Sequence, residues 1–192
     1  MHHFESFRLP DEHENPDAYA EKLFGSQINR GINFASYDDI PVEISEGSAD
    51  PIKSLSEAEF DAQIVPNLER MGFEDLTPIQ QYSIPVLLDY QDLMACAQTG
   101  SGKTAAFLLP IISRIIEEKE KSDQIYIDDE IKAKPRAVIV SPTRELAVQI
   151  FTESKKITFG TNIRPCVVYG GAPVNKQIRY LHNYKNYFSN QS

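Results

Sequence analysis

Residues 97–104, Ala-Gln-Thr-Gly-Ser-Gly-Lys-Thr, have the types and spacing of a loop that binds phosphate groups. Apolar residues 93–96 precede the loop and apolar residues 105–109 follow it, which predicts the order strand, tight loop, helix. Backbone N–H groups in such a loop point inward, and the positive end of the new helix lies beneath them, so both favour phosphate. Lys103 would reach the β- and γ-phosphates of a nucleotide, and the hydroxyl of Thr104 would hold Mg²⁺. The predicted phosphate-binding residues are Ala97, Gln98, Thr99, Gly100, Ser101, Gly102, Lys103 and Thr104.

The first position of this loop departs from the usual pattern, which has glycine where this chain has Ala97. Only Gly100 and Gly102 sit where the backbone must approach a phosphate closely, so the departure is compatible with binding. A chance occurrence of the motif on a surface loop is the alternative. The strand and helix patterns on either side argue against it.

Composition indicates one domain of ordinary size, since 192 residues with 41% hydrophobic side chains can build a core. No apolar run is long enough to span a bilayer, and the first residues do not resemble a secretory signal. Cys96 and Cys166 lie in apolar, strand-like runs, which predicts buried, reduced thiols in a cytosolic protein. The four histidines have no metal-ligand spacing. We expect a cytoplasmic protein, with the nucleus as the alternative.

The net charge of −9 argues against a nucleic-acid partner, but the charge is unevenly distributed. Residues 1–50 carry 11 acidic and 3 basic side chains, whereas residues 135–192 carry 2 acidic and 8 basic ones. A basic face behind an acidic segment is compatible with a polyanion.

The organisation along the chain predicts an α/β fold. Residues 1–50 show no sustained period, and we expect them to be mostly disordered or extended. Helices are predicted from about Ser56 to a stop at Gly72, from Pro78 to Pro85, and over residues 104–121 and 143–156. Pro85 should bend or end the second of these helices. Residues 122–134 are a polar loop. Residues 93–96, 137–140 and 165–169 are predicted strands, and strands that alternate with helices imply a parallel sheet covered on both faces.

Residues 73–80, Phe-Glu-Asp-Leu-Thr-Pro-Ile-Gln, together with the phosphate loop resemble the adenine-reading segment of DEAD-box ATP-dependent RNA helicases. The resemblance implies ATP and Mg²⁺ as cofactors, a hydrogen bond from Gln80 to the adenine edge and stacking of Phe73 on the base. An amide suits adenine, which presents a donor beside an acceptor. A further aromatic of the family falls at Leu55, where this chain lacks it. Without the loop, Gln80 would be an ordinary helix-surface residue.

Two later segments resemble the elements with which this family touches RNA. Residues 141–147, Ser-Pro-Thr-Arg-Glu-Leu-Ala, imply phosphate contacts at Pro142, Thr143 and Arg144, and Arg144 stands where a helix N-terminus also favours phosphate. Gly170 and Gly171 resemble the paired glycine whose backbone approaches the RNA strand. The implied RNA binding is to the backbone and independent of base sequence. The alternatives are that Thr143 only caps a helix and that the glycines only end a strand.

Residues 31–34 and 37–43 look like the lead-in of the Vasa-type subfamily, so the resemblance runs from about Leu23 to Arg179. The family's Asp-Glu-Ala-Asp element is absent from the 192 residues, and residues 11–14 do not replace it because they precede the loop without an apolar strand. The second domain with its arginine finger is also absent, so no catalytic residue is assigned. Residues 180–192 are rich in Asn and Tyr and do not continue the pattern, and we expect a truncated or mispredicted gene product.

These inferences predict an acidic segment over residues 1–50, an incomplete RecA-like P-loop domain over 51–179 and an atypical tail over 180–192. The expected function is the ATP-binding N-terminal part of an RNA helicase that separates duplexes by closing two domains on ATP and RNA. The alternative is a non-catalytic nucleotide-binding fragment. A GTPase is excluded because the chain has no Asn-Lys-x-Asp base reader.

Overall fold

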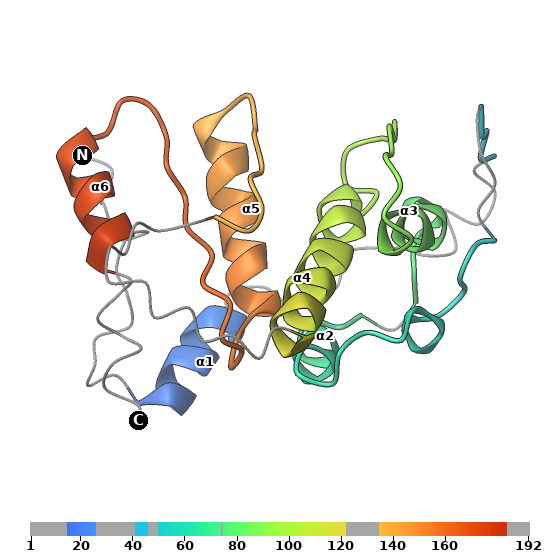
Figure 1. Ribbon diagram of the computed structural model, residues 1–192, viewed down its shortest axis with the longest axis horizontal. Helices are drawn as coiled ribbons and strands as arrows, with labels where there is room; N and C mark the ends of the chain where they lie inside the picture. Colours follow the sequence, from blue (N-terminus) through green and yellow to red (C-terminus); the bar gives the residue numbers. More distant parts are fainter. Residues whose placement is uncertain (1–14, 26–40, 46–49, 74, 122–134, 184–192) are drawn as a thin grey trace.

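The computed structural model describes residues 15–25, 41–45, 50–73, 75–121 and 135–183. In Figure 1, α6, α5, α4 and α3 follow one another from left to right, with α1 and α2 below them. No helix in the described ranges is long and apolar enough to cross a membrane. The helices are α1 (Pro16–Gly25), the 3₁₀ helix η3 (Leu55–Ala58), α2 (Val65–Arg70), α3 (Pro78–Leu88), α4 (Lys103–Lys121), α5 (Arg144–Ile157) and α6 (Val174–Asn183).

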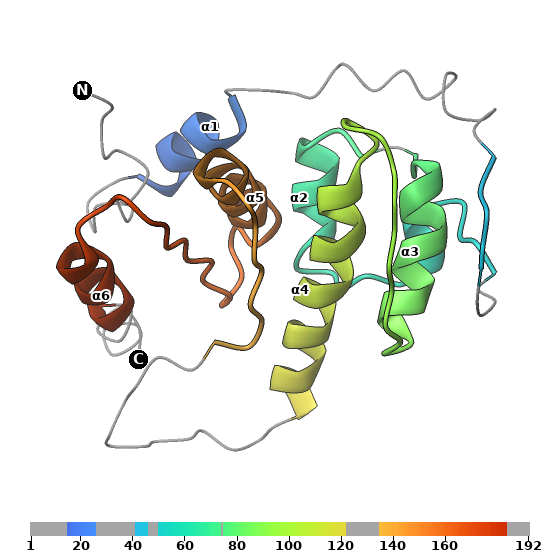
Figure 2. The ribbon, with the colours of Figure 1, turned by 90° about the horizontal axis from the view of Figure 1, so that it is seen from above.

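The hydrophobic core lies between α2, α3, α4 and α5. Helix α3 packs against α4, and α5 packs against both α4 and α2. In Figure 2, α4 lies between α3 and α5. Most core side chains are aliphatic and lie on the facing stripes of these helices, as amphipathic helices require. The most deeply buried are Ile64, Leu68, Ile84, Leu109 and Ile157.

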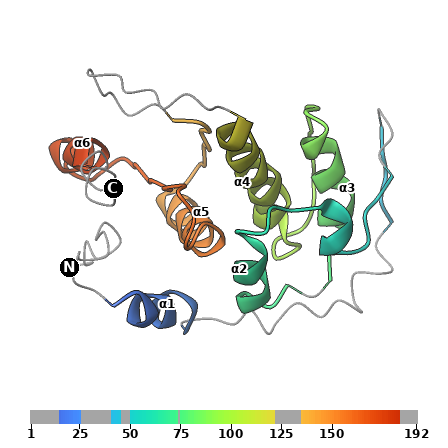
Figure 3. The ribbon, with the colours of Figure 1, turned by 60° about the horizontal axis from the view of Figure 1, so that its bottom comes forward.

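Helix α1 is a helical exception within residues 1–50, which we expect to be mostly disordered or extended. It lies beside the C-terminal end of α5 in Figure 3 and buries Leu23 there. Phe24 meets the Phe159 ring edge-on with ring centroids 5.7 Å apart, and Tyr19 stacks on Phe159 at 6.2 Å. Arg70 covers Phe24 and Phe159 from α2. Aromatic burial therefore holds a helix that its acidic, unpatterned surroundings do not predict; residues 1–14, 26–40 and 46–49 lie outside the described ranges.

The helix expected from Ser56 is divided into η3 and α2. Glu59 ends η3 in the left-handed region, with φ of 49°, and the chain re-enters a helix at Val65. Gly72 then stops α2, as predicted, at φ of 78°. The break lets Ala58, Phe60 and Ile64 all reach the core, and this tertiary packing overrides the local helical spacing.

Helix α3 continues through Pro85, so of the two predicted outcomes, a bend or an end, the end is excluded. A proline inside a helix leaves the carbonyl four residues earlier without its usual donor. Here that carbonyl belongs to Gln81, and it accepts a hydrogen bond from the backbone N–H of Ile52 at 3.1 Å. The preceding chain thus satisfies the group that Pro85 leaves open. Thr77 and Pro78 begin α3 as predicted.

The three segments expected as strands are extended but form no ladder, and no β-strand occurs within the described ranges. Figure 2 shows them apart from one another, beside α3 and α4, beside α5 and ahead of α6. Their apolar side chains are open to solvent, Met94 at 93% and Val140 at 89% exposure. Cys96 and Cys166 are likewise exposed, so the prediction of buried thiols is wrong. A β-strand requires a ladder of hydrogen bonds with a neighbouring strand, and none of the three segments has such a ladder here.

Candidate functional site

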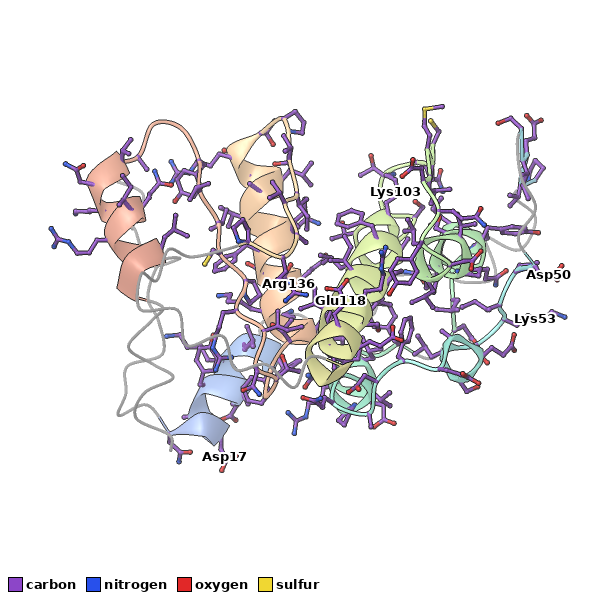
Figure 4. All side chains as sticks on the ribbon, viewed as in Figure 1. Asp17, Asp50, Lys53, Lys103, Glu118 and Arg136 are labelled. Carbon is purple, nitrogen blue, oxygen red and sulfur yellow. The ribbon has the colours of Figure 1, made fainter. Side chains whose placement is uncertain are left out.

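The predicted phosphate loop connects an extended segment to the first turn of α4. Gly100 and Gly102 both have positive φ, 84° and 88°, which only glycine adopts without strain. The Ser101 N–H donates to the Gln98 carbonyl at 3.4 Å and closes the turn. Figure 4 shows Lys103 where α4 begins, at the end of that helix that carries the loop. The backbone therefore turns where the sequence predicts it.

Lys103 points back into its own loop. Its ammonium group donates to the backbone carbonyls of Ala97 and Gln98, which lie across the loop from the start of α4. The lysine is thus already at the centre of the turn, with its charge between the two ends of the loop. A phosphate that enters the loop would meet this charge together with the N-terminal end of α4.

Gln80 is buried, at 2% exposure, and bridges α3 to the loop. Its Oε1 accepts from the Thr77 backbone N–H at 3.0 Å, and its Nε2 donates to the Gly102 carbonyl at 3.2 Å. A Cβ at position 102 would lie only 2.5 Å from Nε2, so this amide, as well as the backbone φ, requires glycine there. Sequence reasoning missed this bracing role, although a glutamine three residues after a helix cap is its local signal.

The remaining residues that are predicted to bind the nucleotide differ in how deeply they are buried. Phe73 is half-buried and packs against the hydrophobic core, as does Leu55, so the contacts of Phe73 in this structure are with protein. Ala97, Gln98 and Thr99 are exposed.

The loop fits a phosphate and a cation held through it. The hydroxyl of Ser101 is buried with no hydrogen-bond partner among the described residues, which leaves a donor in the loop for an incoming oxygen. Thr104 follows on the first turn of α4 and is partly exposed. Within the described ranges no group of three acidic, histidine or cysteine side chains could hold a metal ion. Mg²⁺ here would depend on Thr104 and on phosphate oxygens.

The predicted RNA residues begin α5. Thr143 caps that helix, because its Oγ1 accepts from the Leu146 N–H at 3.2 Å, and Pro142 is exposed just before it. The exposed Arg144 lies over the ring of Tyr169, with 4.3 Å from its Cζ to the ring centroid. Its Nη2 donates to the Tyr169 hydroxyl at 3.3 Å. The structure therefore brings Arg144 to the residue that immediately precedes Gly170 and Gly171.

The glycine pair is open to solvent. A Cβ at Gly170 or Gly171 would meet nothing within 4 Å, so internal packing does not demand glycine at either position. The φ of 77° at Gly171 does favour it. Gln177 of α6, which sequence reasoning missed, is buried and bonds both the N–H and the carbonyl of Tyr169 with its amide.

The two candidate sites face the same side of the molecule. In Figure 1, α4, α5 and α6 stand with their N-terminal ends toward the top, so the loops that precede all three helices lie at that side. Those loops hold residues 97–102, 141–143 and 170–173. Three helix N-termini on one side favour anionic ligands there.

A glycine loop closed around a lysine at the start of a helix is the arrangement of P-loop proteins. The model of the DEAD/DEAH box helicase family matches residues 77–191, more than half of the chain. This chain therefore belongs to the DEAD/DEAH box helicase family.

Solved DEAD-box helicases are similar to this chain and imply a RecA-like domain. A DEAD box protein from Methanococcus jannaschii is 30% identical, with a TM-score of 0.55. The matched region covers 68% of this chain and 32% of that protein's chain. The helicase Prp28 from Chaetomium thermophilum, bound to ADP, is 35% identical, with a TM-score of 0.57, and the match covers 71% of this chain and 31% of the Prp28 chain. A Dbp5 variant from S. cerevisiae, bound to Gle1 and IP6, is 27% identical, with a TM-score of 0.52, and the match covers 66% of this chain and 30% of the Dbp5 chain. The chain thus spans about a third of these relatives.

Proposed function

We propose that this chain is the ATP-binding part of an RNA helicase that remodels duplexes in an ATP-dependent reaction. The observation that carries the proposal is the phosphate loop, in which Lys103 is held by the carbonyls of Ala97 and Gln98 and Gln80 bonds Gly102. Family membership and an ADP-bound relative support a nucleotide as the ligand. Adenine reading by Gln80 and Phe73 and cation binding by Thr104 belong to the same proposal.

Calorimetric titration of residues 1–192 with ADP tests the nucleotide site. Lys103→Ala is expected to weaken binding by roughly tenfold or more, because a charge-assisted contact to phosphate contributes about 1.5–3 kcal/mol. The matched control is Lys53→Ala, an exposed lysine on the chain before η3, far from Lys103 in Figure 4. Equal affinities of the wild type and Lys103→Ala would remove the loop from the proposal.

We propose that RNA binds the side on which α5 and α6 begin, through Pro142, Thr143, Arg144, Gly170 and Gly171. The basic excess of residues 135–192 supports this assignment. Because these groups address the phosphate chain, binding should be weak, salt-dependent and independent of base sequence. Salt-insensitive, sequence-selective binding to a set of fluorescent oligonucleotides would contradict it.

The alternative function is nucleotide binding without chemistry. Phosphoryl transfer needs an acidic Mg²⁺ partner, a positioned water and a charge-stabilising arginine, and an arginine finger alone contributes about 10³–10⁵ in rate. The 192 residues contain no Asp-Glu-Ala-Asp, so residues 1–192 alone are expected to bind rather than hydrolyse ATP. RNA-stimulated phosphate release, with Lys103→Ala as the contaminant control, separates the two functions: robust turnover that the substitution abolishes would favour the enzyme.

The Vasa-type subfamily, suggested by residues 31–34 and 37–43, belongs to this proposal, as do a parallel sheet and a cytoplasmic or nuclear location. The family match and the DEAD-box relatives support the sheet, because they imply a RecA-like domain.

A further inference from the structure

Tyr169 is the point at which the two predicted RNA elements meet. The Arg144 guanidinium lies over its ring, 4.3 Å from Cζ to the centroid, and Nη2 donates to its hydroxyl at 3.3 Å. The residue that follows Tyr169 is the first of the glycine pair. Arg144 and Tyr169 stand 25 residues apart in sequence, so the pair is a tertiary contact.

Tyr169 is itself held from the opposite direction by α6. The Tyr169 N–H donates to Gln177 Oε1 at 3.0 Å, and Gln177 Nε2 donates to the Tyr169 carbonyl at 3.1 Å. This amide pairs with the backbone as a neighbouring strand would, and Gln177 is buried at 7% exposure. Gln177 Nε2 also lies 3.4 Å from the Ala172 carbonyl, beyond the glycine pair. The backbone of Tyr169 and the turn after it are therefore anchored to α6.

We propose that Tyr169 is a positioning residue, which holds Arg144 in the orientation that binds an RNA phosphate beside Gly170 and Gly171. This inference rests on the proposed RNA binding. A guanidinium has five N–H donors, and the hydrogen bond to the Tyr169 hydroxyl engages one of them. The ring occupies one face of the guanidinium and leaves its edge as the phosphate-binding side. Holding a long, exposed side chain in one orientation lowers the entropy lost when it binds.

The test measures binding of a short fluorescent poly(U) oligonucleotide to residues 1–192 at low salt. Tyr169→Leu should weaken binding by about two- to fivefold, the equivalent of a cation–π contact at an exposed site. Tyr169→Phe keeps the ring and should retain most of the affinity. Arg144→Ala should weaken binding by about tenfold, through loss of a charged phosphate contact. In the Arg144→Ala background, Tyr169→Leu should have no further effect, because the residue that it positions is gone.

The same substitution at Tyr90 is the matched control. Tyr90 also carries an arginine over its ring, Arg114 at 3.5 Å, but the pair joins the end of α3 to α4. Tyr90→Leu should leave RNA affinity unchanged. Arg144→Lys tests the same contact by changing the arginine instead of the tyrosine. The lysine keeps the positive charge but loses the planar contact with the ring, so RNA binding should weaken nearly as much as in Tyr169→Leu. ADP affinity, measured on every variant, reports whether the chain is folded.

The outcomes separate the inference from the proposed function. If Arg144→Ala weakens RNA binding but Tyr169→Leu and Arg144→Lys do not, the positioning role is wrong and the RNA site stands. If Arg144→Ala has no effect, the RNA site at α5 is wrong and the inference falls with it. If Tyr169→Leu weakens binding equally with and without Arg144, Tyr169 acts independently of Arg144 and the inference is wrong. Should Tyr169→Leu lose ADP binding, the comparison of Arg144→Lys with wild type decides.

Discussion

Gln80 has two sets of hydrogen-bond partners, one within the protein and one expected on the adenine base. In this structure its oxygen accepts from the Thr77 N–H and its nitrogen donates to the Gly102 carbonyl, which uses one of its two lone pairs and one of its two N–H donors. The family resemblance assigns the same amide to the adenine edge. The second N–H and the second lone pair would therefore bind the adenine edge, while the two present bonds continue to hold the loop. Loop geometry and base identity are in this way linked through one side chain.

Gln80→Glu separates these roles. A carboxylate still accepts from the Thr77 N–H but cannot donate to the Gly102 carbonyl, which keeps only its bond from the Ala106 N–H and now faces a carboxylate oxygen. We expect the free energy of unfolding without nucleotide to fall by about 1–3 kcal/mol, measured by urea denaturation. Affinity for both ATP and GTP should fall with it. Gln80→Ala should also lose a preference for ATP over GTP.

The control for this prediction is Gln63→Ala, at an exposed glutamine outside the loop, which should leave both stability and affinity unchanged. If Gln80→Glu unfolds at the same urea concentration as the wild type, the bond to Gly102 does not stabilise the loop.

The C-terminal end of α5 depends on a side chain from α2. Asn67 is buried at 3% exposure, and its Nδ2 donates to the carbonyls of Ile157 at 2.9 Å and Phe159 at 2.7 Å. The last carbonyls of a helix have no partner within the helix, so Asn67 satisfies groups that α5 cannot satisfy itself. The same end of α5 receives the aromatic side chains of α1, and three helices thus meet at one point.

Asn67→Asp should be strongly destabilising for so small a change. The substitution replaces the donor by an oxygen, which then faces two carbonyl oxygens in a buried place. We expect a loss of about 1–3 kcal/mol or more in the free energy of unfolding. The exposed Asn162 gives the control: Asn162→Asp should change stability by less than about 0.5 kcal/mol. Equal effects of the two substitutions in urea denaturation would contradict this account.

Helix α5 also carries a carboxyl group whose burial costs stability. Burial raises the pKa of Glu153, while a hydrogen bond with Gln149 and the charge of Lys156 act in the opposite direction with smaller effect. Burial likewise lowers the pKa of Lys155, and the charge of Lys22 on α1 adds to that shift. Each side chain is therefore easier to neutralise in the folded chain than in the unfolded one.

Glu153→Gln should consequently stabilise the protein at neutral pH. Because the folded pKa lies above the unfolded one, the contribution of Glu153 is fully present at low pH and is lost as pH rises through the folded value. The melting temperature of the variant should exceed that of the wild type at pH 7, and the gap should close as pH falls toward 4.5. Glu69→Gln, at an exposed position on α2, is the control. A gap that widened on acidification would reverse the sign of the argument.

The molecule as a whole combines a packed helical core with the three segments expected as strands, which form no β-ladder within the described ranges. Exposed apolar side chains are grouped on these segments, with Val138 at 75%, Val140 at 89% and Met94 at 93% exposure. An extended, apolar segment with open backbone groups is a template for pairing with another chain. We expect residues 1–192 to self-associate at concentrations at which a protein with a fully covered core remains monomeric.

Val140→Lys distinguishes the open arrangement from a closed sheet. If Val140 is exposed, the substitution should lower association, measured by light scattering after size-exclusion chromatography, and leave the free energy of unfolding within about 0.5 kcal/mol. A sheet that buried Val140 would instead make the variant several kcal/mol less stable, because an unpaired charge would be buried. Val174→Lys, on the exposed side of α6, gives the control for an apolar residue outside the extended segments.

The sequence by itself determined the local features of this protein. The loop glycines, the caps at Thr77 and Thr143 and the stop at Gly72 depend on backbone conformations and hydrogen bonds within a few residues, so their residue types announce them. Motif spacing was also enough for the family, which the match over residues 77–191 confirms.

Only the tertiary structure decided how these local features depend on one another. The bond from Gln80 to Gly102 spans 22 residues, the Arg144–Tyr169 contact 25 and the Asn67–Ile157 bond 90. The continuation of α3 through Pro85 was left open, and the docking of α1 and the exposure of Cys96 were missed, for the same reason. In each case the deciding partner lies on another element, or the pairing neighbour is missing from the described chain, and neither fact leaves a signal in nearby residues.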